Sequence, residues 1–421
     1  MGGTYVRQRI VQFAKTKLAW NAKDKELAVL DVRLLLDYEH SAEAWLREEE
    51  LVESGMRIAY SVPRHRQYMY SGYPSEPILA EAAASVWADI QREGGHIPAI
   101  LERYIRIGLI RKGERGELVA RLLLLLAFDA AVQRAGGELY TTEVKLIDFL
   151  RELFGDHHYD NTIAKSKPSA GQIPFDEAFK NAHVRFTHFG RNRNATLANT
   201  KGASAAILRS MAIQCHSGQE MIDIIIPVAL KPQGLQEENM SAVTISIKDR
   251  LVPSTKAKVD IRASKISFFP KNQVKYGGTE HGRPYMALIL ELGTEPTRNP
   301  PFNREEIDNT EMMEVDEVDD PDEIELSDKD LQLGTVIAKQ QPTRQSTRST
   351  ANQPIVNPCY TVYAYGCTSY VYKVVKNENL FSSLLGSRTL FDEHPSAVPE
   401  ERIQRLKPLW EDSKACLDWY G

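Results

Sequence analysis

The stretch from 221 to 250 constrains the fold more than any other part of the sequence. It holds an apolar, β-branched run, M-I-D-I-I-I-P-V-A-L, and then S-A-V-T-I-S-I-K-D-R, in which apolar and polar residues alternate. Both patterns predict strands, and the short polar connection between them favours an antiparallel pair. Because strand side chains have a period of two, Ser246 and Lys248 share one face of the predicted sheet. Pairing in the right register would place Asp223 beside Lys248.

An aspartate and a lysine side by side on a sheet have a chemical use. A carboxylate is a hard oxygen ligand for Mg²⁺, and a nearby ammonium can orient a water molecule or offset phosphate charge. This arrangement resembles the PD-(D/E)xK nuclease pattern, but the position two before the lysine, which should be Glu, Asp or sometimes Gln, is Ser246. A hydroxyl is a far weaker metal ligand than a carboxylate. The alternative, an aspartate at a strand start and a solvated lysine, stays open.

Length and composition predict a globular protein of two or three domains. The chain has 421 residues, of which 42% are hydrophobic, so it can bury a substantial core. The cysteines lie far apart and form no C-x-x-C motif, which indicates neither a zinc site nor a disulfide framework and fits a reducing compartment. They are Cys215, Cys359, Cys367 and Cys416.

The sequence shows no sign of membrane insertion or of a nucleotide triphosphate site. Its first residues lack the apolar run of a secretory signal, and the longest apolar run, 122–128, is too short to span a bilayer. No G-x-x-x-x-G-K-[ST] phosphate loop occurs anywhere. We therefore expect no membrane partner and a cytoplasmic or nuclear location.

The charge is unevenly distributed along the chain. The net charge is −5, yet residues 305–330 alone carry fourteen acidic residues against one lysine, so the rest is mildly basic. A basic segment follows Lys248, with Lys256, Lys258, Arg262, Lys265, Lys271 and Lys275. Such a body is compatible with nucleic acid as a partner, and ordinary solvation explains the same pattern equally well.

Two predicted helices precede the predicted strands in the sequence. Five consecutive leucines within 113–134 make that helix apolar nearly all round, which predicts deep burial. Glu117 near its start could be a further metal ligand, or it could pair with Arg121 four residues on. A second helix, over 141–154, is expected to end at Gly155, and we place the following His157 and His158 on the surface.

The remaining pattern completes the predicted architecture. Helical spacing marks 5–53, a buried strand is expected over 283–293, and two aromatic strands over 359–375. The fold class is thus α/β, a mixed β-sheet flanked by helices with a restriction-endonuclease-like core. The expected domains are a helical N-terminal region (1–72), a nuclease-like domain (73–300 and 354–421) and a disordered acidic and polar insert (301–353).

Several blocks together resemble the carboxy-terminal part of fungal Crinkler-type proteins. The resemblance runs over most of the chain from about Val52, without the acidic insert. It rests on G-Y-P-S-E-P-I-L-A-E-A-A-A, R-G-E-L-V-A-R-L-L-L, F-T-H-F, I-D-I-I-I-P-V, I-K-D-R, R-P-Y-M-A-L-I-L-E-L-G, Y-A-Y-G-C and the terminal H-P and L-K-P-L-W.

The resemblance implies metal-dependent cleavage of nucleic acid, with use as an effector or conflict toxin. In that family an NTPase module commonly precedes a domain similar to restriction endonucleases, so a chain without a phosphate loop looks like a truncated form or the product of a fragmented gene. By carry-over, Asp223 and Lys248 match the motif positions, Glu117 matches the helix glutamate, and Ser246 does not match.

These observations lead to one expected function and two alternatives. We expect a nuclease-like domain in which Mg²⁺ is held by Asp223, the main chain at Ile247 and Glu117, while Lys248 positions the attacking water. The first alternative is a non-catalytic nucleic-acid-binding or protein-interaction domain derived from a nuclease fold. The second is a structural domain without chemistry. The sequence leaves the oligomeric state open.

Overall fold

The computed structural model divides into two compact units, which are described separately. The first comprises Met1–Leu122 and Asn377–Gly421, and the second Leu123–Lys376. The predicted domain boundaries at 72 and 300 stay predictions. The structure describes residues 2–21, 24–62, 64, 69–111, 115–168, 171–192, 198–215, 221–232, 235–249, 267–270, 275–277, 281–293, 336–339 and 355–386.

The described residues of the first unit are mainly helical, with one small hairpin and an isolated bridge between Tyr38 and Ile110, which confirms the helical spacing predicted over 5–53. Asp24 and Ser41 cap the second and third helices through their side chains, which accept hydrogen bonds from the first-turn amides. The elements are α1 (Gly2–Asn21), α2 (Lys25–Leu34), α3 (Ala42–Glu53), β1 (Ile58–Ser61), β2 (Tyr70–Gly72), α4 (Pro77–Arg92), α5 (Ile97–Arg106) and α11 (Glu378–Leu385).

A buried ion network joins the helices of the first unit to its hairpin. The guanidinium of Arg57 contacts the carboxylate of Asp31 on α2 and lies 3.7 Å from that of Glu48 on α3. Its Nε donates to the hydroxyl of Ser71 on β2 at 2.7 Å, and its Cζ lies 4.9 Å from the centroid of the Tyr38 ring. Burial raises the pKa of Asp31 to about 6, although Arg57 opposes that rise.

The helix with five consecutive leucines is buried as predicted. It forms α6 (Arg115–Arg134), and its residues from Leu122 to Leu125 are fully inaccessible. Phe128 of α6 contacts Phe149 and Phe186 within the second unit, at centroid distances of 6.5 and 4.6 Å. Among the described helices, none combines the length and apolar character that crossing a bilayer requires.

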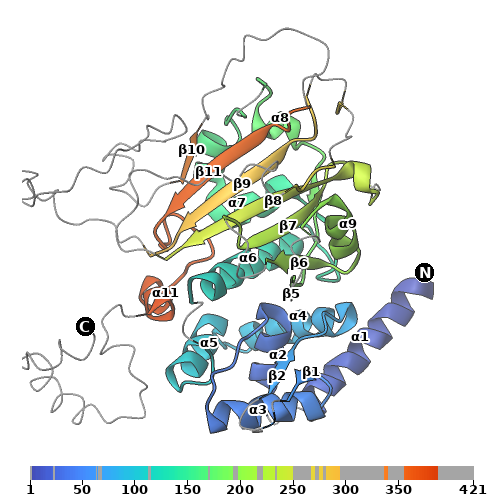
Figure 1. Cartoon of the computed structure of the whole chain (residues 1–421), viewed down its shortest axis with the longest axis vertical. Coiled ribbons are helices and arrows are strands. Elements are labelled where there is room, and N and C mark those ends of the chain that lie inside the picture. The colour runs from blue at the N-terminus through green and yellow to red at the C-terminus, as the bar shows by residue number, and fades with distance from the viewer. Residues whose placement is uncertain are drawn as a thin grey trace, which may run out of the picture. The chain divides into compact units, whose positions relative to one another are not determined.

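The second unit is built on a mixed sheet flanked by helices (Figure 1), which confirms the predicted α/β class in this coarse form. The strand order is β10-β11-β9-β8-β7-β4-β3, and β6 pairs with both β7 and β5. The strands are β3 (Val144–Lys145), β4 (His183–Val184), β5 (His188–Arg191), β6 (Met211–Gln214), β7 (Ile224–Ala229), β8 (Met240–Lys248), β9 (Tyr285–Glu291), β10 (Val336–Lys339) and β11 (Cys359–Tyr365). The helical elements are α7 (Leu146–His158), η2 (Tyr159–Ile163), α8 (Phe175–Ala178), α9 (Thr200–Leu208) and η4 (Glu237–Asn239).

The predicted antiparallel pair is present as β7 and β8, with Ile224 opposite Ile245. On its other edge β8 runs parallel to β9, which in turn runs parallel to β11. Pro227 is tolerated inside β7 because the second edge of that strand changes partner there: β6 pairs up to Ile225 and β4 pairs from Val228.

Both faces of the sheet are covered, so its central strands are apolar throughout. On one face α9 packs over β7 and β8, and Phe269 contacts Tyr285 of β9 at 5.9 Å between ring centroids. On the other face Tyr360 of β11 contacts Phe175 and Phe179, each at 5.4 Å between centroids. Burial on two faces explains why β7 and β9 read as continuous apolar runs.

Three predictions from the sequence are wrong in this unit. Val336–Lys339 lie inside the segment expected to be disordered, yet they form β10 and satisfy the outer edge of β11; most of the remaining insert lies outside the described residues. The second aromatic strand is absent, because residues 366–376 form turns in which the Lys373 amide donates to the Leu153 carbonyl at 2.9 Å. His158 is buried, because Gly155 turns the chain there with φ of 77°; His157 is exposed as expected.

We predict that replacing Arg57 with Met lowers the free energy of unfolding by about 3–5 kcal/mol, because Asp31 then stays buried without its cation. Chemical denaturation at pH 7 measures the change. The double variant Asp31→Asn, Arg57→Met should recover much of the loss. Replacing Arg103, whose ion pair with Glu26 at 2.6 Å is half-exposed, should cost less than about 1 kcal/mol. Equal losses for Arg57 and Arg103 would contradict the role of the network.

Candidate functional site

The aspartate and the lysine singled out by the sequence both lie at the carboxyl end of β8, near enough for their charges to interact, without forming an ion pair. Asp223 directly precedes β7, and its Oδ2 accepts a hydrogen bond from the Ile247 amide at 2.6 Å. The Asp223 amide donates to the Ile245 carbonyl at 2.9 Å, which fixes the start of β7 against β8. Lys248 is the next residue after Ile247, and both Asp223 and Lys248 are half-buried. The two side chains therefore lie at one edge of the same sheet.

The main chain of Ile247 contributes a second oxygen to this place. In a strand, the N–H and the C=O of one residue point toward the same neighbouring strand. Since the Ile247 amide points at Asp223, its carbonyl is directed to the same side of β8. The carbonyl of Lys248 points to the opposite side of β8, because it accepts a hydrogen bond from the amide of Leu292, next to β9, at 2.9 Å. The predicted role of the Ile247 main chain is thus compatible with the geometry.

The parallel strands beyond β8 bring further polar residues to the same face. Residues in register on neighbouring strands share a face, and Lys248 is in register with Glu291 of β9, just as Ser246 is with Ile289. Ile289 is in register with Tyr363 of β11. Asp223 lies two residues before Ile225, which pairs with Thr244 on this face. We call Asp223, Ser246, Lys248, Glu291 and Tyr363 the strand-end cluster.

The charges of the cluster act on one another. Burial raises the pKa of Asp223 above its usual range, while the Ile247 amide and the Lys248 ammonium oppose that rise. Burial, together with Cys359 and the Glu291 carboxylate, raises the pKa of Tyr363 to about 12. Asp223 and Glu291 therefore belong to a partly desolvated environment in which a cation is electrostatically favoured.

Ser246 occupies the position where the nuclease pattern has a carboxylate. It is fully buried, and within the described residues its hydroxyl has no hydrogen-bond partner; the same holds for the hydroxyl of Tyr363. No three His, Cys, Asp or Glu side chains in the described ranges are grouped so that they could hold a metal ion. The protein oxygens for a metal here are those of Asp223 and Ile247, a set compatible with Mg²⁺, which often binds through one or two carboxylates and keeps several waters.

The third predicted ligand, Glu117, is half-buried in the first turn of α6 and belongs to the first unit, whereas Asp223 and Lys248 belong to the second. The strand-end cluster is therefore described without it, and its role as a ligand stays a prediction. Of the basic segment after β8, only Lys275 falls within the described residues. The proposed phosphate contacts of Lys256, Lys258, Arg262, Lys265 and Lys271 lie outside them.

Sequence reasoning missed two members of the cluster, Glu291 and Tyr363. Glu291 follows six buried residues of β9 and is itself almost inaccessible. A carboxylate that ends an otherwise apolar strand is a usable signal, because such a charge is rarely buried without a partner. Tyr363 carries no such signal, since aromatic residues are common in strands for packing alone.

Comparison with known proteins gives one match. A family described as a domain of unknown function, DUF8736, matches residues 22–314, which is more than half of the chain. No curated protein and no solved structure matches.

We predict that Lys248→Met raises the pKa of Asp223 further, because the ammonium that favours its carboxylate is lost. Carbon-13 NMR of labelled aspartate measures the titration. Lys165→Met is the matched control, since that exposed ammonium is not among the charges that act on Asp223.

The same shift has a consequence for stability. The folded pKa of Asp223 lies above the ordinary value of 3.8, so its contribution to the unfolding free energy is present below pH 3.8 and is lost as the pH rises toward the folded pKa. In Lys248→Met this loss should extend to higher pH. An Asp223 titration that is the same in both proteins would contradict the proximity of the two charges.

Proposed function

The chain belongs to the family described as a domain of unknown function (DUF8736), and since that description carries no activity, we propose a function from the strand-end cluster. We propose that the second unit is a nuclease-like domain that hydrolyses phosphodiesters of DNA or RNA with the help of Mg²⁺. The proposal includes a restriction-endonuclease-like core for the mixed sheet. It also includes kinship with Crinkler-type proteins, a role as an effector and a cytoplasmic or nuclear location.

One observation carries the proposal. The carboxylate of Asp223 contacts the Ile247 main chain at 2.6 Å, directly beside Lys248, at the carboxyl end of a buried strand. The carboxylate of Asp223, the carbonyl of Ile247 and the ammonium of Lys248 are three of the groups in the nuclease pattern, and Ser246 stands where the pattern has its second carboxylate. The rigid ladder on both edges of β8 holds them without any loop between them.

Each group has a chemical task in the proposed reaction. Bound Mg²⁺ would polarise the phosphodiester and lower the pKa of a bound water. Asp223 and the Ile247 carbonyl would hold the cation, with Glu117 as a further candidate ligand. Lys248 would donate a hydrogen bond to the attacking water or to a phosphate oxygen. The water oxygen bonds to phosphorus, the bond from phosphorus to the leaving oxygen breaks, and a proton passes to that oxygen.

A second candidate function is a non-catalytic nucleic-acid-binding domain derived from a nuclease. The buried Ser246 hydroxyl favours it, because it offers a neutral oxygen where a carboxylate would hold the cation. Under this alternative Lys248 and the basic segment after it contact phosphates, and no bond is cleaved.

We predict that nicking of a supercoiled plasmid, or cleavage of a single-stranded RNA, requires Mg²⁺ or Mn²⁺ and falls by roughly 10²-fold or more in Asp223→Asn and in Lys248→Met. Asp223→Asn keeps an oxygen that can accept from the Ile247 amide, so folding should be retained, as thermal unfolding would check. Lys165→Met controls for the loss of a positive charge. Cleavage that survives both substitutions and chelation by EDTA would overturn the proposal.

Variants at Ser246 separate the two candidates. If the wild type binds nucleic acid without cleaving it and Ser246→Glu gains cleavage, the second candidate is correct. Ser246→Leu adds comparable bulk without a metal-ligating oxygen and controls for overpacking of this buried position. A gain of cleavage in both variants would contradict the role of residue 246 as a metal ligand, because leucine supplies no ligand. A wild type that neither binds nor cleaves nucleic acid excludes both candidates.

A further inference from the structure

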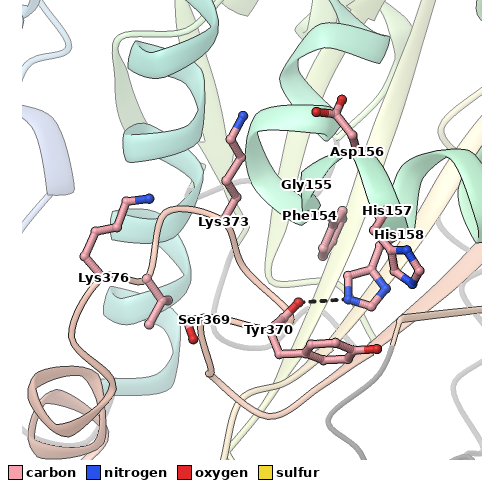
Figure 2. Close-up of a pocket in the computed structure, with 10 residues that line it drawn as sticks. Phe154, Gly155, Asp156, His157, His158, Ser369, Tyr370, Lys373 and Lys376 are labelled. Carbon is pink, nitrogen blue, oxygen red and sulfur yellow. Dashed lines mark hydrogen bonds between the residues drawn. The ribbon is translucent and has the colours of Figure 1, made fainter.

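A cleft opens in the second unit between the end of α7 and the segment 369–376. Its volume is about 510 Å³, within the range of small-molecule sites. Figure 2 shows Lys373 and Lys376 on one side of the opening, His157 and His158 on the other, and the ring of Tyr370 beneath the histidines. None of these residues belongs to the strand-end cluster. We call this the α7-end cleft.

Backbone contacts hold the walls of the α7-end cleft in place. The amide of Lys373 donates to the carbonyl of Leu153 at 2.9 Å, and Nε2 of His158 lies 2.8 Å from the Tyr370 carbonyl. Burial lowers the pKa of His158, which favours the neutral ring with its proton on Nε2. Phe154 packs against Tyr372 at 5.6 Å between centroids. The cleft is therefore largely preformed, and a ligand need not order it.

Cations outnumber carboxylates around the cleft. Glu152 is shared by Lys373 at 2.9 Å and Arg134 at 3.0 Å, so one carboxylate lies between two cations. The guanidinium of Arg151 forms ion pairs with the carboxylates of Asp156 at 2.8 Å and Asp160 at 2.6 Å. Within the described part of the chain, Lys376 forms no ion pair. Lys376 lines the same cleft as Lys373, and its ammonium leaves one positive charge for an anion to neutralise.

An aromatic surface lies beside these cations. Tyr370 is 54% exposed, and its carbonyl is held by Nε2 of His158. Its ring packs perpendicular to that of His158, at 4.9 Å between centroids and 90° between the planes, which orients the ring. Exposed aromatic faces next to basic groups stack planar rings, and nucleobases are the common example.

We propose that the α7-end cleft binds a nucleoside monophosphate, free or as the terminal nucleotide of a strand. The phosphate is held by Lys376 and Lys373, and the base stacks on Tyr370. The hydroxyl of Ser369 and the ring of His157 line the same opening. The proposal goes beyond the proposed function, because it needs neither a metal nor the strand-end cluster.

Titration calorimetry of the full chain with AMP tests the proposal, in EDTA so that no cleavage enters the result. We expect AMP to bind, and adenosine and inorganic phosphate each to bind at least tenfold more weakly. A 5′-phosphorylated dinucleotide that competes with AMP would identify a strand end as the source, and one that does not compete would identify the free nucleotide.

The variants that decide it are Lys376→Ala and Tyr370→Ala. Both residues are at the surface, and the hydrogen bond of Tyr370 uses its main chain, so both variants should fold. Each should weaken AMP at least tenfold, Tyr370→Phe should bind as the wild type does, and Lys165→Ala is the matched control. AMP binding that is absent, equal to that of inorganic phosphate, or unchanged in both alanine variants overturns the proposal.

Discussion

The arrangement of the second unit depends on β8, the strand at which the sheet changes direction. It is antiparallel to β7 along one edge and parallel to β9 along the other, and helices or aromatic side chains cover both faces. In a strand bonded on both edges and buried on both faces, a charged side chain is stable only where it finds a partner or reaches the end of the strand. The charged residue of β8, Lys248, is therefore at its carboxyl end, where it is half-buried and the next residue, Asp249, is exposed.

Much of this could be predicted because the signal is local. The alternation of Val243, Ile245 and Ile247 with polar neighbours predicted a strand and its faces, and the preceding apolar run predicted the antiparallel partner. Together they placed Asp223 beside Lys248. The five leucines from Leu122 onward predicted a buried helix for the same reason, since hydrophobic periodicity reports on the immediate surroundings of each element.

The rest could not be predicted because it depends on contacts between distant segments. The register of β9 on β8 brings Glu291 to Lys248 across 43 positions of sequence, and no local pattern specifies that register. Tyr370 to Val375 have the composition of a strand, yet their amides and carbonyls bond to the end of α7. His158 follows a glycine in a polar stretch, which suggested a surface loop, but the turn at Gly155 directs it inward. The α7-end cleft is formed by these two segments, both of which were predicted wrongly, so the cleft could not be predicted from the sequence.

If the strand-end cluster binds Mg²⁺ as proposed, Ser246 is a compromise between cation binding and folding. Burial already raises the pKa of Asp223, and Glu291 on β9 is nearly inaccessible. A carboxylate at 246 would place a third acid on the same buried face, with Lys248 as the adjacent cation. Without a bound metal, three neighbouring carboxylates on a buried face would not all stay ionised. Each proton taken up would lower the affinity for a cation. Under the proposed function, a serine would avoid that repulsion and keep the sheet stable in the absence of metal. The cation would then be held more weakly and would depend more on the phosphates of the substrate to complete its coordination.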